Sequence, residues 1–216
     1  FTGRSGTFYG YEGLGSIYWH MVSKLLLAVC DTYYRAVKEG ADEESLGRLV
    51  EHYYDIRAGI GHNKSPDLYG AFPTDPYSHT PGNAGAQQPG MTGQVKEDIL
   101  SRMGELGVVV EEGKIHFNPV LLRKSEFLTE PGMFSYYTMS GEAQEIEIPA
   151  ESLAFTYGQV PVIYHLSEKA RIKVVLENDK TEETEGLVLS AENSKAIFQR
   201  SGKILRIEVF LTPRIS

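Results

Sequence analysis

The sequence predicts a chain that is helical up to about residue 106 and rich in β-strand from residue 107 to residue 216. Two observations predict this order. In the first part, apolar residues recur at steps of three and four residues, as in amphipathic helices. After Gly107 the chain contains short runs in which apolar and polar residues partly alternate, as in strands. Glycines and an Asn178-Asp179 pair separate these runs as turns. With 216 residues, the chain is long enough for one large domain or two small ones, which we place at 1–106 and 107–216.

Three helices are expected in the first part. The first covers residues 16–38 and stops at Gly40, and the second begins after Asp42, whose carboxylate is a good N-cap. The third covers about residues 91–106. The apolar residues that recur on it at packing distance are Val95, Ile99, Met103 and Leu106.

Strands are expected throughout the second part. The turn Glu111-Glu112-Gly113 predicts a hairpin between residues 108–110 and 114–118. Further β-like runs cover 133–139, 145–148, 153–157, 160–165, 171–177, 186–189, 196–199 and 205–211.

Composition and charge exclude several functions. The chain carries 21 basic and 29 acidic residues, a net charge of −8, without a basic cluster, which argues against a nucleic-acid or anionic-membrane surface. A single cysteine, Cys30, excludes an intrachain disulfide and a cysteine-based zinc site, and a buried inert thiol is expected. The chain opens with Phe1 and has no visible secretory signal. We therefore expect a truncated start and favour a cytoplasmic location.

Two loop segments carry the residues most suited to chemistry. Residues 61–90 hold five prolines and five glycines together with aromatic, amide, carboxylate and imidazole side chains, and residues 1–15 are rich in glycine. Aromatic faces stack on pyranose rings, and polar groups bond their hydroxyls. The alternative is that the rings only pin the loops to the helices. The candidate substrate-binding residues are Tyr11, His62, Tyr77, His79, Gln87 and Gln88, and the candidate catalytic carboxylates are Glu12 and Asp75.

Two positions suit an anion. His20 lies at the start of the first helix, and Thr92 with Gly93 precedes the third, where free backbone N–H groups favour negative charge. The alternatives are a core histidine and a simple N-cap. His62, Asp75 and His79 have metal-ligand chemistry, but Pro76 prevents a helical turn between the last two, so neither a metal nor a cofactor is expected.

Several motifs together resemble one known family. Gly6-Thr7-Phe8-Tyr9, Gly15-Ser16-Ile17-Tyr18-Trp19-His20 and Gly85-Ala86-Gln87-Gln88-Pro89-Gly90-Met91-Thr92-Gly93 occur in order and at sensible spacing over about the first 120 residues. This pattern is similar to the C-terminal part of the cellobiose and chitobiose phosphorylases. The resemblance implies the last hairpins of an (α/α)6 toroid, of the six-hairpin glycosidase type, followed by a β-rich, sandwich-like domain. It assigns His20, Thr92 and Gly93 to phosphate and places the general acid upstream of Phe1.

The leading hypothesis is therefore a C-terminal fragment of a carbohydrate-active enzyme that cleaves glycosidic bonds. In one version of it cleavage is phosphorolytic, and the fragment is expected to be inactive on its own. Its partners would be an oligosaccharide, inorganic phosphate, and the remainder of the toroid or another subunit. One alternative is an inverting glycoside hydrolase of the same fold, with Glu12 or Asp75 as the base. Another is a non-catalytic carbohydrate-binding or assembly subunit, and the last is a helical and β-rich domain without a site. The toroid hypothesis also places His20 beside Thr92.

Overall fold

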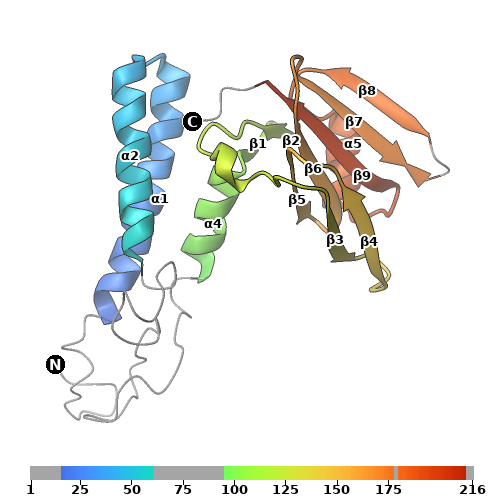
Figure 1. Cartoon of the computed structure of the whole chain (residues 1–216), viewed down its shortest axis with the longest axis horizontal. Helices are drawn as coiled ribbons and strands as arrows, with labels where there is room; N and C mark the ends of the chain where they lie inside the picture. The colour runs from blue at the N-terminus through green and yellow to red at the C-terminus, as the bar shows by residue number, and fades with distance from the viewer. Residues whose placement is uncertain (1–15, 61–94, 178–179, 213–216) are drawn as a thin grey trace, which may run out of the picture. The chain divides into compact units, whose positions relative to one another are not determined.

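The chain divides into two compact units, Phe1–Arg102 and Met103–Ser216 (Figure 1). The computed structural model describes residues 16–60, 95–177 and 180–212, with side chains from residue 22 in the first range and residue 96 in the second. Each unit is described by itself below. Within these ranges, none of the helices has the length and apolar character that crossing a bilayer requires.

The first unit contains α1 (Ser16–Glu39), α2 (Glu43–Gly59) and most of α4 (Val95–Glu105). The N-cap predicted at Asp42 is confirmed, because its carboxylate accepts hydrogen bonds from the Ser45 backbone N–H and hydroxyl, both at 2.8 Å. Helices α1 and α2 pack side by side (Figure 1). Their buried apolar side chains are Leu26, Cys30, Tyr33, Tyr53 and Tyr54, with Ile60 at the end of α2.

The second unit is built on a five-stranded mixed sheet with strand order β5-β6-β9-β7-β8. The strands are β5 (Ser152–Tyr157), β6 (Val160–Leu166), β7 (Arg171–Leu176), β8 (Thr181–Glu185) and β9 (Ile204–Leu211). Central strand β9 is parallel to β6 and antiparallel to β7, and β8 forms one edge. This order places β9, the last of the described strands, in the middle of the sheet.

One face of the sheet is covered by a hairpin and a helix. The hairpin is β1 (Val108–Glu111) with β2 (Lys114–Phe117), as predicted from the turn at Gly113, and the helix is α5 (Ala191–Phe198). The Ser194 hydroxyl accepts a 3.0 Å hydrogen bond from the Ile115 N–H and so joins α5 to β2. The core between these layers includes Ile115, Phe117, Val162, Tyr164, Ile172, Ile197, Ile207 and Val209.

A separate two-stranded hairpin completes the second unit. It pairs β3 (Gly132–Tyr137) with β4 (Ala143–Ile148), and it follows the short 3-10 helix η3 (Lys124–Glu126). The hairpin is anchored to the sheet by two features: β4 contacts β5, and the Gln159 side chain donates a 3.2 Å hydrogen bond to the Thr138 carbonyl.

The predicted fold class is wrong. The described residues contain four α-helices, the five-stranded mixed sheet and two small hairpins, and they do not show the ring of helical hairpins of an (α/α)6 toroid. The β-rich part is a single main sheet with α5 and the β1–β2 hairpin on one face, rather than a sandwich of two large sheets. Helical spacing marks which face of a helix packs, but it does not specify what that face packs against.

Two strand predictions are also wrong, and one strand was missed. Residues 196–198 belong to α5 and Gln199 is its C-cap, and the N-cap Ser190 accepts a hydrogen bond from the Asn193 N–H. Residues 186–189 make only an isolated bridge, between Val188 and His116. Strand β8, Thr-Glu-Glu-Thr-Glu, has no apolar residue, so its sequence carries no alternating signal, and it forms through pairing with β7.

Candidate functional site

Most of the residues that the sequence singled out lie outside the described part of the chain. This holds for Tyr11, Glu12, His62, Asp75, Tyr77, His79, Gln87, Gln88, Thr92 and Gly93. His20 lies near the start of α1, but the structure does not describe its side chain. The predicted proximity of His20 and Thr92 therefore stays a prediction. Three other groups of polar side chains are described, two in the second unit and one in the first.

The first group is a row of side chains across the outer face of the main sheet. Strand register pairs Ser152 with His165, His165 with Phe210, and Phe210 with Arg171, so the four residues stand side by side on β5, β6, β9 and β7. The Ser152 hydroxyl is 3.1 Å from His165 Nδ1, and the His165 and Phe210 rings stack with centroids 4.9 Å apart. The Arg171 guanidinium lies 3.7 Å from the centre of the Phe210 ring. The row is thus held by contacts between neighbouring strands.

A carboxylate lies beside this row. Glu208 Oε2 is 4.0 Å from His165 Nε2, and Glu208 Oε1 receives the Arg206 guanidinium at 2.8 Å. Burial lowers the pKa of His165, as do the nearby positive charges of Arg206, Arg171 and Lys173, and only Glu208 opposes them. His165 is therefore held in its neutral form at neutral pH.

The order serine, histidine, carboxylate raises the question of nucleophilic catalysis. The geometry argues against it. The Ser152 side chain is fully buried, so its hydroxyl cannot reach a substrate. The Glu208 carboxylate is beyond hydrogen-bond distance of the imidazole and is engaged by Arg206 instead. The row is best interpreted as a polar network that covers the open face of the sheet.

The second group is the outward face of the β3–β4 hairpin, which we call the Tyr137 face. It consists of Met133, Ser135 and Tyr137 on β3 with Glu145 and Glu147 on β4, all exposed and on one side because the register pairs Ser135 with Glu145 and Met133 with Glu147. The Ser135 hydroxyl donates a 3.1 Å hydrogen bond to Glu145.

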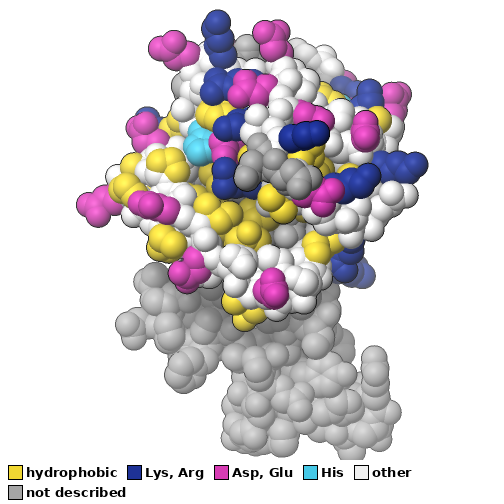
Figure 2. All heavy atoms as spheres, turned by 90° about the vertical axis from the view of Figure 1, so that its right-hand side faces the viewer, with side chains coloured by type: hydrophobic (Ala, Val, Ile, Leu, Met, Phe, Trp, Pro, Cys, Tyr) yellow, Lys and Arg dark blue, Asp and Glu magenta, His cyan; other side chains and the backbone are white. Residues whose placement is uncertain are grey.

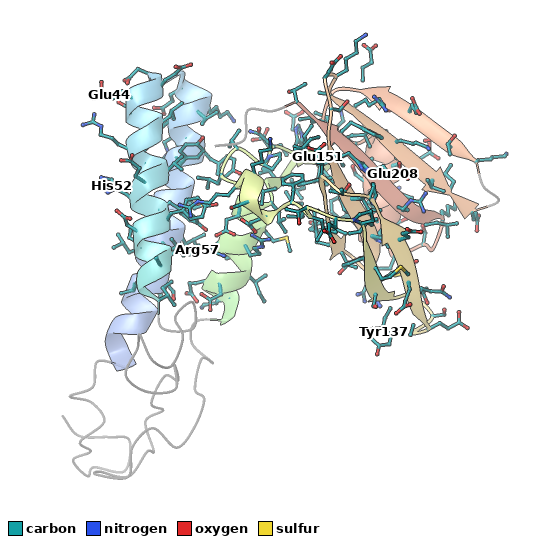
Figure 3. All side chains as sticks on the ribbon, in the orientation of Figure 1. Glu44, His52, Arg57, Tyr137, Glu151 and Glu208 are labelled. Carbon is teal, nitrogen blue, oxygen red and sulfur yellow. The ribbon has the colours of Figure 1, made fainter. Side chains whose placement is uncertain are left out.

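The Tyr137 ring is the most accessible part of this face. Its side chain is 66% exposed, and Figure 3 shows it projecting from the hairpin, away from the sheet on which Glu208 lies. On the opposite side of β3, the half-buried Phe134 and Tyr136 rings stack with an interplanar angle of 10° and stiffen the strand. An exposed aromatic ring therefore lies on this hairpin next to the Ser135 hydroxyl and the Glu145 carboxylate.

The third group lies in the first unit, on α4. The packing predicted for this helix is confirmed at Leu106, which is buried in the apolar core, and at Met103, which packs against it, and it is wrong at Ile99. Ile99 is 54% exposed, and the neighbouring Leu100 is 53% exposed. Glu97 and Ser101 are buried in their place, with 5% and 3% of each residue exposed. The sequence shows that Glu97 and Ser101, four residues apart, lie on one face of the helix. It gives no sign that this face is buried.

The surface of the second unit also contains a hollow of about 380 Å³ between α5 and the β7–β8 hairpin. Its charged lining residues are Lys180, Lys195, Lys203, Glu177, Glu182 and Glu192. Figure 2 likewise shows positive and negative side chains interspersed over the face of this unit that is in view. Neither sign dominates the hollow, and no aromatic ring lines it, so it suits neither a polyanion nor a stacked sugar.

Comparisons with known proteins add no family to this geometry. The chain matches no protein-family model and no curated protein sequence. Within the described ranges, no three or more His, Cys, Asp or Glu side chains are grouped in a way that could hold a metal ion. The functional interpretation therefore rests on the residues themselves and on the resemblance described above.

Proposed function

We propose that this chain is part of a carbohydrate-active enzyme that acts on glycosidic bonds, and that the unit Met103–Ser216 is a non-catalytic module that contacts the glycan. The proposal joins two of the hypotheses drawn from the sequence. The resemblance and the composition of the loops support the enzymatic part, and the geometry of the second unit supports the module.

The main observation in support of a glycan-contacting module is the Tyr137 face. A sugar ring has an apolar face that stacks on an aromatic ring and a rim of hydroxyls that bond polar groups. The exposed Tyr137 ring supplies the first contact, and the Glu145 carboxylate, two residues along β4 from the residue that pairs with Tyr137, accepts hydrogen bonds from hydroxyls. The stacked Phe134 and Tyr136 rings behind β3 keep this arrangement in place without the ligand, which lowers the entropic cost of binding.

The second unit also has the core that a separate module needs. Its buried apolar cluster runs from Leu106 to Leu211 and includes residues of β2, of α5 and of every strand of the main sheet except β8. The cluster lies entirely within Met103–Ser216. We therefore expect the unit to keep its fold without the helical part, as the carbohydrate-binding hypothesis requires.

We assign the chemistry of cleavage to the loops and the helical part of the chain. Phosphorolysis would use His20, Thr92 and Gly93 to hold inorganic phosphate, while hydrolysis would need a carboxylate such as Glu12 or Asp75 to activate water. Because the resemblance places the general acid upstream of Phe1, we expect the 216-residue chain alone to release no sugar, with or without phosphate. Sugar release by the purified chain would contradict this expectation.

The module is tested by measuring binding of cello- and chito-oligosaccharides to the 216-residue chain by calorimetry. A stacked ring contributes on the order of 1 kcal/mol, so Tyr137→Ala is expected to weaken binding roughly fivefold. Phe198→Ala is the matched control, because Phe198 on α5 is 46% exposed and is not part of the Tyr137 face. Equal affinities for the wild type and Tyr137→Ala would refute the role of this face.

A further inference from the structure

The β3–β4 hairpin leaves the outer edge of β3 open. Thr138 and Glu142 close the hairpin, because the Thr138 N–H donates a 2.9 Å hydrogen bond to the Glu142 carbonyl. In an antiparallel ladder, the backbone groups of every second residue point toward the partner strand. Counted back from Thr138, the N–H and C=O groups of Met133, Ser135 and Tyr137 therefore point away from β4. Within the described part of the chain, none of these backbone groups has a hydrogen-bond partner.

This edge carries no charged side chain. Strand β3 reads Gly-Met-Phe-Ser-Tyr-Tyr, whereas β4 carries Glu145 and Glu147, and β8 at the edge of the main sheet carries three glutamates. Charged side chains on an edge strand hinder its pairing with a further strand. Strands β4 and β8 are protected in this way, and β3 is not.

The side chains along the open edge are accessible, and the hairpin has no third strand. Met133 is 60% exposed and Tyr137 is 66% exposed. A two-stranded hairpin is marginally stable in water, and a third strand stabilises it. Among the described residues, β3 and β4 form a sheet of their own, which the Gln159 hydrogen bond and the contacts between β4 and β5 hold to the unit. A strand added at β3 would satisfy its free backbone groups and widen this sheet.

We propose that a second copy of this chain pairs with the β3 edge, so that the two hairpins form a four-stranded antiparallel sheet about a two-fold axis. In the register centred on the axis, Ser135 lies opposite Ser135 of the second copy, and Met133 lies opposite Tyr137 of the second copy. All three outward-pointing residues of each strand then exchange backbone hydrogen bonds. A register shifted by two residues leaves one of them unpaired, so the centred register is favoured.

The side chains on both faces of β3 suit this register. On the exposed face, the Met133 thioether lies beside the Tyr137 ring of the second copy, and such sulfur–aromatic contacts are favourable. On the other face, Phe134 lies beside Tyr136 of the second copy as a cross-strand aromatic pair. Ser135, at the axis, is small and uncharged. The sequence of β3 is thus complementary to itself when reversed, which is why we assign the edge to a second copy.

The carboxylates of the hairpin do not oppose this pairing. Glu145 lies on β4, opposite Ser135 of the same hairpin. In the joined sheet, the Glu145 residues of the two copies are three strand spacings apart, or about 14 Å. The screening length at physiological salt is about 8 Å, so their repulsion is largely screened.

The pairing is independent of glycan binding, because it uses backbone groups and the side chains of β3. A two-fold axis perpendicular to the sheet keeps the Tyr137 faces of both copies on the same side. The dimer would therefore present two such faces next to each other. A chain that binds no glycan would still be expected to pair.

The test measures the oligomeric state of the full 216-residue chain by sedimentation velocity, from low micromolar to several hundred micromolar. A short strand interface is expected to give a dimer with a dissociation constant on the order of 10–100 µM. Ser135→Lys places two ammonium groups opposite each other in the dimer, but within each hairpin its ammonium group lies opposite Glu145, so the fold is kept. We expect this variant to dimerise at least about tenfold more weakly than the wild type.

Gln144→Lys is the matched control. Gln144 is an exposed residue of β4 that pairs with Tyr136, so this variant adds the same charge to the same hairpin away from the open edge. It is expected to dimerise like the wild type. A wild type that stays monomeric over the whole range, or a Ser135→Lys variant that dimerises as tightly as the wild type, would overturn the proposal.

Disulfide cross-linking tests the register itself. Residues opposite each other in a hydrogen-bonded antiparallel pair have Cα atoms about 5.5 Å apart, within the 4.4–6.8 Å that a disulfide spans. Ser135→Cys is therefore expected to form a covalent dimer on mild oxidation, whereas Gln144→Cys is not. The native Cys30 is only 2% exposed and does not compete. If Ser135→Cys gives no more covalent dimer than Gln144→Cys, the pairing through β3 is refuted.

Discussion

Gly107 is the position where one added methyl group should do the most damage to the second unit. Its φ is +67°, in the left-handed region, and a Cβ at this residue would lie 2.1 Å from the carbonyl carbon of Asn118 and 2.2 Å from the nitrogen of Pro119. Both are backbone atoms, which cannot rotate away. The Asn118 N–H also donates a 2.7 Å hydrogen bond to the Gly107 carbonyl, so relieving the clash would break the contact that closes this corner.

The expected cost of Gly107→Ala follows from two contributions. A left-handed conformation costs a non-glycine residue roughly 1–2 kcal/mol, and forcing an extra carbon into a filled space typically costs 1–3 kcal/mol. The free energy of unfolding should therefore fall by about 2–5 kcal/mol. For a domain of about 100 residues, each kcal/mol lowers Tm by roughly 4–8 °C.

Gly113→Ala supplies the matched control. Gly113 also has a positive φ, +76°, but an added Cβ would meet nothing within 4 Å. Both variants carry the strain of the left-handed region and the same loss of freedom in the unfolded chain, so their difference isolates the clash with Asn118 and Pro119. Urea unfolding of the full chain, followed by circular dichroism in the β-sheet region, measures both. If Gly107→Ala is no less stable than Gly113→Ala, the close approach described here is wrong.

Two further predictions concern the main sheet. The Tyr164 hydroxyl donates a hydrogen bond to the Leu106 carbonyl from a fully buried position, so Tyr164→Phe should lower the free energy of unfolding by about 1 kcal/mol in urea titrations; an unchanged value would mean that this bond contributes nothing. Because burial lowers the pKa of His165 below its ordinary 6.5, the unfolded chain binds the proton first as pH falls. The stability contributed by neutral His165 is therefore complete above about pH 6.5 and declines as pH falls toward the folded-state pKa. Between pH 7.5 and 5.5, the free energy of unfolding should fall more steeply for the wild type than for His165→Gln. Identical slopes of this free energy against pH would contradict the lowered pKa of His165.

Parts of the candidate site could be predicted from the sequence and parts could not. The loops of residues 1–15 and 61–90 were identified by composition, but the structure does not describe them, so their residues stay predictions. The Tyr137 face and the buried Glu97 were missed for different reasons. Tyr137 lies in a segment predicted as a strand, but which side of a hairpin faces solvent depends on what the other side packs against. Glu97 was missed because charged residues on a helix are ordinarily solvated.

The sequence by itself determined the local structure. Apolar spacing and the Asp42 cap located α1 and α2, and the turn at Gly113 located the β1–β2 hairpin, because caps and tight turns depend on residues close together in the chain.

Only the tertiary structure decided how these elements are used. Strand β8 has no apolar residue and forms by pairing with the edge of β7. Residues 196–198 are helical although their sequence resembles a strand, and Ile197 packs in the core from that helix. Helix α4 was located by its period, but its buried side carries Glu97 and Ser101 rather than Ile99. The physical reason is the same in each case: local patterns fix backbone conformation, whereas burial, pairing and the partner of each face depend on contacts between residues far apart in the sequence.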